Sequence, residues 1–352
     1  MPGAITGIWD NRAVSVLDRW HRPLGHLRIS VTDRCNLRCA YCMPEEDYVW
    51  LPRPDLLRFE EIDRVTRIFV GLGVTHVRLT GGEPLLRRAM PELVRRLASI
   101  DGVSDLAMTS NGVLLADQAA TLRDAGLTRV TVSLDTLDRA RFQGLARRDE
   151  LPRVLAGITA ASAAFGHLKL DTVLMRGVND DELVPLVDYA WQTGAEVRFI
   201  EYMDVGGATR WAFDAVVSQA EMLTRLEAAF GRIDALPSDG SAPAGRFRLP
   251  RGQVVGIIAS TTQPFCDTCD RIRLTADGQL FFCLYGTRGL DLRTPLRDGA
   301  SDADLAALIT QSWQARADRG AEDRLGTPGR GAFISADSLR TRPHLEMHTR
   351  GG

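Results

Sequence analysis

Three cysteines lie within eight residues in the first part of the chain, at Cys35, Cys39 and Cys42. They follow the apolar segment 27–31, and three thiols cannot all pair in disulfides among themselves. Three thiolates from one loop can instead hold three corners of a cubane iron–sulfur cluster, which usually takes four cysteine ligands. The remaining iron would be an open position, as the fourth site of a catalytic zinc is open to water or substrate. The spacing therefore favours a cluster with one reactive iron.

Two other interpretations fit parts of this cysteine run. A Cys-x2-Cys pair is also typical of structural zinc sites and of thioredoxin-type redox sites, and buried thiols can be chemically inert. Zinc would need a fourth ligand, and the nearest histidines, His26 and His76, lie in other segments. The spacing alone leaves zinc and inert thiols open while favouring iron and sulfur.

A second group of three cysteines lies at Cys266, Cys269 and Cys283. An Ala-Asp-Gly turn between the last two predicts a β-hairpin that brings Cys283 back beside the other two. Arg271 and Arg273 are two residues apart on the expected strand, so their side chains share a face. Adjacent guanidiniums favour an anion between them, and their planar donors suit phosphate. A zinc knuckle with solvated arginines is the alternative, but three thiolates again favour an open iron.

The composition is ordinary for a soluble protein. The 352 residues are 45% hydrophobic and 25% charged, which predicts one large domain with a smaller one. A formal net charge of −2 argues against general nucleic-acid or membrane-surface binding, so an anionic ligand would need a local arginine cluster. We find no signal-peptide pattern and no apolar run of about 20 residues. Six cysteines in two trios then predict metal binding in a reducing cytoplasm.

The pattern from Leu27 onward alternates short β-rich runs with longer helical ones. The predicted strands are Leu27–Thr32, His76–Thr80, Leu106–Thr109, Arg129–Leu134, Lys169–Met175 and Glu196–Tyr202. The predicted helices include Glu60–Leu72, Met90–Ser99, Gln118–Ala125, Pro152–Ala164 and Asp181–Gln192. Such alternation calls for parallel strands with right-handed crossovers. Six units fall short of the eight that close a full barrel, so we expect an α/β fold built on an incomplete (β/α)6 barrel.

The remaining segments are assigned from composition. Residues 1–26 are expected to be a lead-in with moderate helical content, and residues 27–230 the barrel. Residues 231–318, entered through a Pro/Gly/Ser-rich link, are expected to form a smaller C-terminal α+β domain with strands near 247–249 and 254–259. Residues 319–352, rich in Gly, Arg and Pro, are expected to have little fixed structure alone.

Further motifs follow the predicted strands, where barrels of this kind carry their chemistry. Gly81-Gly82-Glu83-Pro84 follows the second strand, and its glycines allow close backbone approach while the carboxylate can accept from an ammonium group. A tight turn with a surface Glu is the alternative. Ser133 and Asp135 end the fourth strand and could bind a ribose or cap a helix. Thr109 and Met203 are weaker signals of the same kind.

The first cysteine run, with Tyr41 before its last Cys, resembles the radical S-adenosylmethionine (SAM) enzymes. The two trios together resemble the GTP 3′,8-cyclase family, which performs the first step of molybdenum cofactor biosynthesis. The matching stretches are residues 27–35, 42–45, 80–87, 198–206 and 266–278, and the terminal Gly351-Gly352. The resemblance spans nearly the whole chain.

This resemblance implies the roles of particular residues. Two 4Fe-4S clusters are implied, one on Cys35, Cys39 and Cys42 with SAM, the other on Cys266, Cys269 and Cys283 with the substrate. SAM contacts are implied for Tyr41, Gly82, Glu83, Ser133 and Met203. GTP contacts are implied for Arg28, Arg78, Thr109, Lys169, Arg198, Arg271, Ile272 and Arg273, of which Arg28, Arg271 and Arg273 would be catalytic. The strand register at Lys169 could slip by one residue, and the terminal Gly-Gly would reach into the site as a mobile plug.

The implied reaction is radical cyclisation of GTP to (8S)-3′,8-cyclo-7,8-dihydroguanosine 5′-triphosphate. It needs an external low-potential electron donor, its product would pass to a cyclic pyranopterin monophosphate synthase, and the enzyme could be a homodimer. Two alternatives remain. A peptide-modifying radical SAM enzyme with an auxiliary cluster would share the first motif, although such relatives tend to carry more C-terminal cysteines. A zinc-stabilised binding module would be no enzyme.

Overall fold

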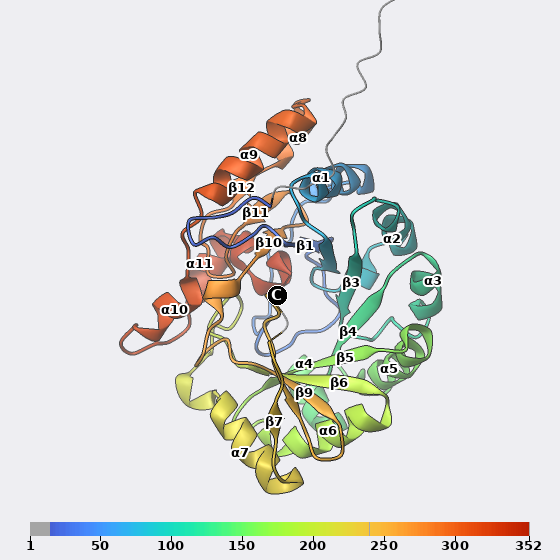
Figure 1. The fold of residues 1–352 in the computed structure, drawn as a ribbon, viewed down its shortest axis with the longest axis vertical. Helices are drawn as coiled ribbons and strands as arrows, with labels where there is room; N and C mark the ends of the chain where they lie inside the picture. Colours follow the sequence, from blue (N-terminus) through green and yellow to red (C-terminus); the bar gives the residue numbers. More distant parts are fainter. Residues whose placement is uncertain (1–14, 239, 352) are drawn as a thin grey trace, which may run out of the picture.

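A computed structural model describes residues 15–238 and 240–351 (Figure 1). Within these ranges, twelve strands form one sheet in the order β12-β11-β10-β1-β2-β3-β4-β5-β6-β9-β8-β7. The strands are β1 (His26–Ser30), β2 (His76–Thr80), β3 (Asp105–Ser110), β4 (Arg129–Ser133), β5 (Leu168–Leu174), β6 (Ala195–Glu201), β7 (Asp234–Ala235), β8 (Gly245–Arg248), β9 (Val254–Ile258), β10 (Arg271–Leu274), β11 (Gln279–Phe281) and β12 (Leu290–Asp291). The helices are α1 (Phe59–Gly71), α2 (Met90–Ala98), α3 (Ala119–Asp124), α4 (Arg139–Ala146), α5 (Leu151–Phe165), α6 (Leu183–Gln192), α7 (Gln219–Phe230), α8 (Arg293–Arg297), α9 (Asp302–Gln314), α10 (Gly320–Leu325), α11 (Ala336–Thr341) and α12 (Met347–Arg350).

The six parallel strands β1 to β6 confirm the predicted incomplete barrel. They pair in chain order, and the helices between them lie on the outside of the curved sheet (Figure 1). Successive side chains along each strand point alternately to the helix layer outside the barrel and to its interior. Leu27 and Ile29 of β1 are fully buried against the helix layer, whereas Arg28 between them lines the interior cavity. Each buried aliphatic side chain contributes about 1.5–3 kcal/mol, and this outward packing leaves the inner face free for polar side chains.

The C-terminal segment extends the barrel sheet at both ends. Strand β9 pairs in parallel with β6, and β10 pairs in parallel with β1, so that Arg271 lies opposite His26. The predicted hairpin is present, because β10 and β11 are antiparallel and Gly278 has a φ of 88° at their turn. The strands of residues 231–318 are therefore continuous with the barrel sheet, where a separate smaller unit was expected.

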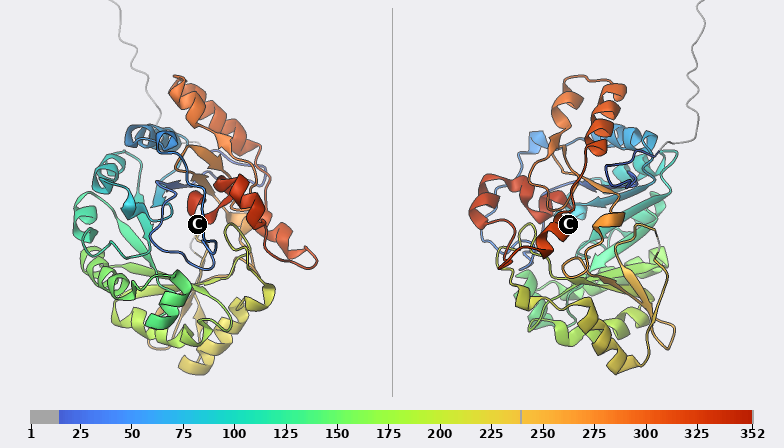
Figure 2. Two further views of the ribbon diagram at one scale, coloured as in Figure 1. Left: turned by 180° about the vertical axis from the view of Figure 1, so that it is seen from behind. Right: turned by 60° about the vertical axis from the view of Figure 1, so that its left-hand side comes forward.

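The tail, for which little fixed structure alone is expected, is helical where it packs on the rest of the chain. Residues 319–351 form α10, α11 and α12, and three of their apolar side chains pack with Phe281 of β11 (Ile334, Leu339 and Leu345). Both views of Figure 2 place these helices beside the barrel, and α12 contacts β1. Composition suggested disorder because the residues that order the tail belong to distant strands. The sequence analysis also named no helix at α4, α7, α8 or α9.

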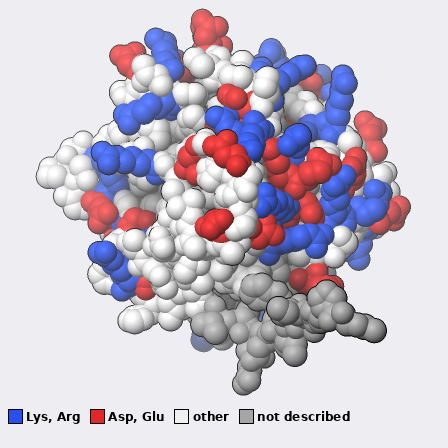
Figure 3. Space-filling view, turned by 90° about the horizontal axis from the view of Figure 1, so that it is seen from above, with Lys and Arg blue, Asp and Glu red and all other residues white. Residues whose placement is uncertain are grey.

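Residues 1–14 of the lead-in, for which moderate helical content is expected over 1–26, lie outside the described ranges. Residues 15–25 are without helix and form a short bridge between Leu17 and Pro23. No helix in the described parts of the chain combines the length and apolar character required to cross a bilayer. On the face in Figure 3, basic and acidic side chains are interspersed, which agrees with the small net charge.

Candidate functional site

The barrel encloses a cavity of about 740 Å³. All six cysteines line this cavity, although the two trios come from segments more than 200 residues apart in the sequence. The cavity is also lined by Arg28, Arg78, Thr109, Lys169, Arg198, Arg271, Arg273, Tyr41, Gly82, Ser133 and Met203. The structure thus brings together every predicted site residue except Glu83 and Ile272.

The first cysteine loop is fixed by the glycine pair that follows β2. The Gly82 N–H donates to the carbonyl of Thr32 at 2.9 Å, and the Glu83 N–H donates to the carbonyl of Arg34 at 2.8 Å. A Cβ at Gly81 would lie 2.4 Å from the Thr32 carbonyl oxygen, and one at Gly82 would lie 2.3 Å from that of Arg34. Only glycine allows the two loops to approach this closely. Packing of the loops therefore explains the glycines at positions 81 and 82 without reference to a ligand.

The N-terminal trio lies in an apolar environment. Burial raises the pKa of Cys35 to about 11 and also raises the pKa values of Cys39 and Cys42. Across residues 15–238 and 240–351, no three His, Cys, Asp or Glu side chains converge closely enough to hold a single metal ion. Three thiolates from one loop are one short of the four cysteines that usually hold a cubane cluster, so this donor set fits a cluster with one open iron.

Glu83 is fully buried and does not line the cavity. Its carboxylate accepts from the Ser110 hydroxyl at 2.9 Å, from the Asn111 N–H at 2.7 Å and from the Leu85 N–H at 3.0 Å. Burial raises its pKa to about 7, and these hydrogen bonds act in the opposite direction. The structure therefore places Glu83 as an organiser of the loop after β3, and its contact with SAM stays a prediction.

Asn111 is a cavity residue that the sequence reading missed. Its side-chain amide donates to Asn36 Oδ1 at 2.7 Å and reaches the sulfur of Cys35 at 3.8 Å. Its position directly after β3 was the available signal, because polar residues at strand ends line sites in barrels. Asn111 links the cysteine loop to the loop that Glu83 holds.

Tyr41 is oriented by Asp135, which lies just after the end of β4. The Tyr41 hydroxyl donates to Asp135 Oδ2 at 2.8 Å, and Asp135 Oδ1 accepts from the Val173 N–H at 2.9 Å. Burial raises the pKa of Asp135 to about 6. The carboxylate is thus used to fix Tyr41 against the cavity wall, alongside the cavity-lining Ser133 and Met203.

The opposite part of the cavity is strongly basic. In the strand register, Arg28 lies between Arg78 of β2 and Arg273 of β10. Burial lowers the pKa of Arg28 well below its ordinary value, and the neighbouring Arg273 and Arg271 lower it further. Burial and Arg271 likewise lower the pKa of Arg273 to about 9. Packed like charges of this kind are relieved by an anion, and a polyanion would relieve several at once.

The other predicted substrate contacts differ in their placement. Lys169 pairs with Thr131 of β4 and lines the cavity, as does Asp171 two residues further along the same strand. Arg198 forms an ion pair with Asp171 at 2.7 Å. Ile272 is fully buried, with its side chain among the core residues. The binding roles of these residues stay predictions.

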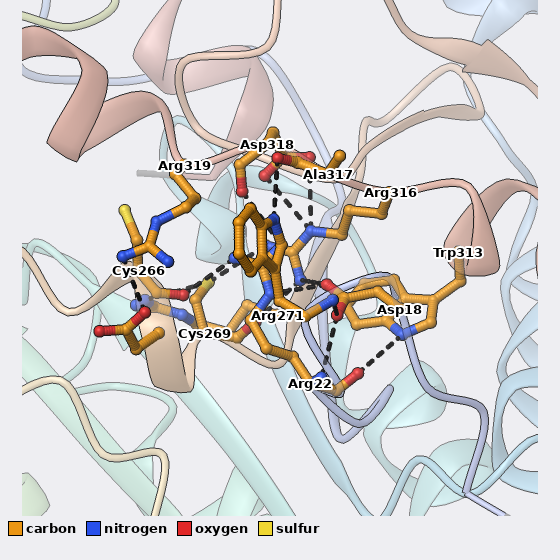
Figure 4. Close-up of polar contacts among 12 residues, drawn as sticks. Asp18, Arg22, Cys266, Cys269, Arg271, Trp313, Arg316, Ala317, Asp318 and Arg319 are labelled. Atoms are coloured by element: carbon orange, nitrogen blue, oxygen red, sulfur yellow. Dashed lines mark hydrogen bonds and ion pairs between the residues drawn. The ribbon is translucent and has the colours of Figure 1, made fainter.

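The C-terminal trio differs electrostatically from the first. Burial raises the pKa of Cys269, but Arg271 and Arg316 outweigh it and lower this pKa to about 6. Burial raises the pKa of Cys283 to about 11 and also raises that of Cys266. Figure 4 shows Arg316 beside the Cys269 loop, within a network that the sequence reading did not find.

The tail reaches the same cavity. Met347 and His348 of α12 line it, and Arg273 donates a 2.6 Å hydrogen bond to the carbonyl of Gly351. Gly351 has a φ of 66°, and a Cβ there would lie 2.2 Å from Cγ2 of Thr80. Gly352 lies outside the described residues, so the predicted plug is described only as far as Gly351.

Comparison with known proteins agrees with this architecture. Residues 29–190 match the model of the Radical SAM superfamily, and residues 195–322 match that of Molybdenum Cofactor Synthesis C. The structure also resembles SuiB of Streptococcus suis bound to S-adenosylmethionine, with a TM-score of 0.55 at 13% identity over 81% of this chain and 68% of that one, a likeness of fold. The chain is therefore a radical SAM enzyme by its fold and by its match to that superfamily.

Three relatives of high sequence identity identify the family to which the chain belongs within this superfamily. GTP 3′,8-cyclase 1 of Mycobacterium tuberculosis strain H37Rv is 54% identical, with 96% of each chain covered. The GTP 3′,8-cyclase of Acidothermus cellulolyticus is 50% identical over 88% of each chain, and that of Xanthomonas campestris pv. campestris strain B100 is 44% identical over 97% of this chain and 99% of the relative. The chain belongs to the GTP 3′,8-cyclase family.

Proposed function

We propose that this protein catalyses the radical SAM-dependent cyclisation of GTP to (8S)-3′,8-cyclo-7,8-dihydroguanosine 5′-triphosphate, the first step of molybdenum cofactor biosynthesis. One observation carries the proposal: two cysteine trios and a group of buried arginines face a single cavity of about 740 Å³. Family membership at 54% identity supports it.

The proposed cofactors are two 4Fe-4S clusters and SAM. Cys35, Cys39 and Cys42 would hold the first cluster, and Cys266, Cys269 and Cys283 the second. When bound, the reduced first cluster and SAM supply the hydrogen-atom abstraction from the GTP ribose that starts the cyclisation. The open position at each trio would accept a ligand, SAM at the first and the guanine of GTP at the second.

The chain's own residues position the reactants and neutralise charge. Arg28, Arg271 and Arg273 lie together on β1 and β10, where they would bind the triphosphate and lower its electrostatic cost. The Arg78 side chain is oriented by the hydrogen bond that it donates to the Thr109 hydroxyl at 3.0 Å. Tyr41, held by Asp135, and Gly82 would orient SAM on the other wall. Met347 and His348 of the tail would help to exclude water.

The organisation of the chain is proposed along the same lines. Residues 27–230 would supply the SAM site and part of the GTP site, and residues 231–318 the second cluster and the remaining GTP contacts. Residues 1–26 would be a lead-in, and residues 319–352 would close the cavity. An external low-potential reductant in the cytoplasm would supply electrons. The product would be used by a cyclic pyranopterin monophosphate synthase, and two copies of the chain could associate as a homodimer.

The test is an anaerobic assay of the reconstituted, reduced protein with SAM and GTP. We expect about eight irons per chain, as two four-iron clusters require, and a cyclised nucleotide with the mass of GTP that separates from it by chromatography. Protein with one cluster or none after careful reconstitution, or GTP recovered unchanged while SAM is cleaved, would contradict the proposal. A colourless protein with bound zinc would instead favour the binding module.

A further inference from the structure

Arg316 follows α9 and lies directly behind the second cysteine loop (Figure 4). Its side chain is 1% exposed. One nitrogen of its guanidinium, Nη1, donates to the backbone carbonyl of Cys269 at 2.8 Å, and the other, Nη2, donates to the sulfur of Cys269 at 3.5 Å. One planar group therefore fixes both the backbone and the sulfur of a single cluster ligand.

The orientation of Arg316 is itself determined by its surroundings. Its guanidinium stacks over the Trp313 ring at 4.5 Å, and Nη1 lies 3.6 Å from the buried carboxylate of Asp18. Arg22 binds the same carboxylate at 2.6 Å and donates to the carbonyl of Cys266 at 2.9 Å. Asp18 thus lies between two arginines that each hold one cysteine of the trio, an arrangement whose several contacts leave the guanidinium little freedom to rotate.

The hydrogen bonds that reach the N-terminal trio come from neutral donors. The sulfur of Cys35 accepts from the Leu37 N–H at 3.5 Å and from the Asn111 amide at 3.8 Å. At Cys269, by contrast, Arg316 and Arg271 are both cationic, and Arg271 Nη2 lies 3.4 Å from the sulfur. Hydrogen bonds and positive charge at the sulfurs favour the reduced, more negative state of an iron–sulfur cluster.

We propose that Arg316 is a positioning residue of the C-terminal cluster, which it holds through Cys269 and whose reduction potential it raises relative to the N-terminal cluster. Asp18 and Trp313 orient Arg316 for this task. The inference rests on the proposed function, because it requires a cluster on the second trio. Its consequence is that the two clusters differ in potential, with the N-terminal one the stronger reductant.

The test is a redox titration, followed by electron paramagnetic resonance, of the full chain with both clusters. In Arg316→Gln we expect the C-terminal cluster to be harder to reduce, by at least a tenfold change in its oxidised-to-reduced ratio at fixed potential, equal to 59 mV for one electron. The N-terminal cluster should keep its potential. Arg316→Lys retains the positive charge but lacks the planar guanidinium. In this variant the C-terminal potential should shift in the same direction by a smaller amount.

Arg319→Gln provides the matched control. Arg319 lies beside the same loop and pairs with Asp267 at 2.7 Å and with Glu322, much as Arg316 pairs with Asp318 at 3.3 Å. Within the described residues, however, the Arg319 guanidinium donates to no cysteine sulfur or carbonyl, whereas that of Arg316 donates to both at Cys269. The Arg319→Gln substitution should therefore change the C-terminal potential less than Arg316→Gln does. Iron content near eight with an unshifted C-terminal potential in both Arg316 variants, or an equal shift in Arg319→Gln, would overturn the inference. If the Arg316→Gln protein does not assemble the second cluster, the inference is tested by the C-terminal potential measured in Arg316→Lys. Wild-type protein that binds only four irons would refute the proposed function instead.

Discussion

Arg273 of β10 donates a 2.6 Å hydrogen bond to the backbone carbonyl of Gly351, near the end of the tail. Arg273 is buried and has like-charged neighbours, so the carbonyl stabilises a cation whose pKa is lowered to about 9 by that burial and by Arg271. The same guanidinium is a predicted ligand of the GTP triphosphate. The contact joins the tail to the basic wall of the cavity, which makes the tail part of the site.

Substitution of Gly351 by Ala tests this relationship. The new Cβ would lie 2.2 Å from Cγ2 of Thr80, and Gly351 is in a left-handed conformation. We expect the tail end to be displaced from Arg273 and cyclisation to fall about tenfold if the misplacement costs about 1.4 kcal/mol in the transition state. The measurement is the rate of cyclic product formed per SAM cleaved.

Gly329→Ala is the control for backbone strain. Gly329 also has a positive φ, 58°, but a Cβ there would meet nothing within 4 Å. Both variants carry the left-handed penalty of about 1–2 kcal/mol, whereas only Gly351→Ala crowds the cavity. Equal activities in the two variants would show that the position of Gly351 does not matter for turnover.

Simultaneous replacement of Arg271 and Arg273 by Ala should weaken GTP binding. A charge-assisted hydrogen bond contributes about 1.5–3 kcal/mol, so the loss should be a few kcal/mol in the binding free energy measured by calorimetry under anaerobic conditions. The double variant Arg248→Ala/Arg251→Ala removes the same charge from exposed positions and should bind GTP normally. Unchanged affinity in the first variant would mean that these two arginines do not contact the substrate.

The two cysteine trios should be separable by serine substitution. Cys266→Ser, Cys269→Ser or Cys283→Ser should abolish cyclisation but leave uncoupled SAM cleavage detectable, because the first cluster site is intact. Cys35→Ser should abolish both reactions. The measurements are 5′-deoxyadenosine, cyclic nucleotide and iron content in the same sample. Normal amounts of cyclic product from any variant of the second trio would argue against its role with the substrate.

Much of the barrel could be predicted because its signals are local. Each of the six predicted barrel strands begins and ends within two residues of its observed bounds, since apolar runs are bounded by Gly, Ser and charged residues. The pairing of β9 with β6 and of β10 with β1 could not be read this way. Strand partners are chosen by tertiary packing, and nothing near Arg271 in the sequence indicates that it lies opposite His26.

In the site, as in the fold, features with a local sequence signal could be predicted and those that depend on distant contacts could not. The cysteines and arginines were predicted because their types and spacing carry chemistry, whereas Asn111 and Arg316 act through contacts with distant segments. Glu83 shows the converse case, in which a motif residue turns into the core and binds Ser110 and Asn111. The tail was predicted to be loose because its ordering contacts, such as Arg350 with the Leu284 carbonyl at 2.7 Å, are long-range.

Glu61 of α1 should stabilise the junction with α8 in a pH-dependent way. Burial raises its pKa, but hydrogen bonds from Arg297 and the Arg58 N–H outweigh burial and lower the pKa to about 2, from an ordinary value of 4.5. Because the folded pKa is the lower one, this stabilisation is present above about pH 4.5 and is lost as the pH falls toward 2. Glu61→Gln should therefore lower the free energy of unfolding by about 1.5–3 kcal/mol at neutral pH.

The measurement is anaerobic urea unfolding of wild type and variants between pH 8 and pH 4. The difference between wild type and Glu61→Gln should be constant down to about pH 5 and begin to shrink near pH 4.5. Glu60→Gln is the control, since the side chain of Glu60 is 64% exposed and its ion pair with Arg96 lies on the surface. Its effect should stay below about 1 kcal/mol. A Glu61→Gln difference no larger than that of Glu60→Gln, or one that grows as the pH falls, would show that the carboxylate does not hold α8 against α1.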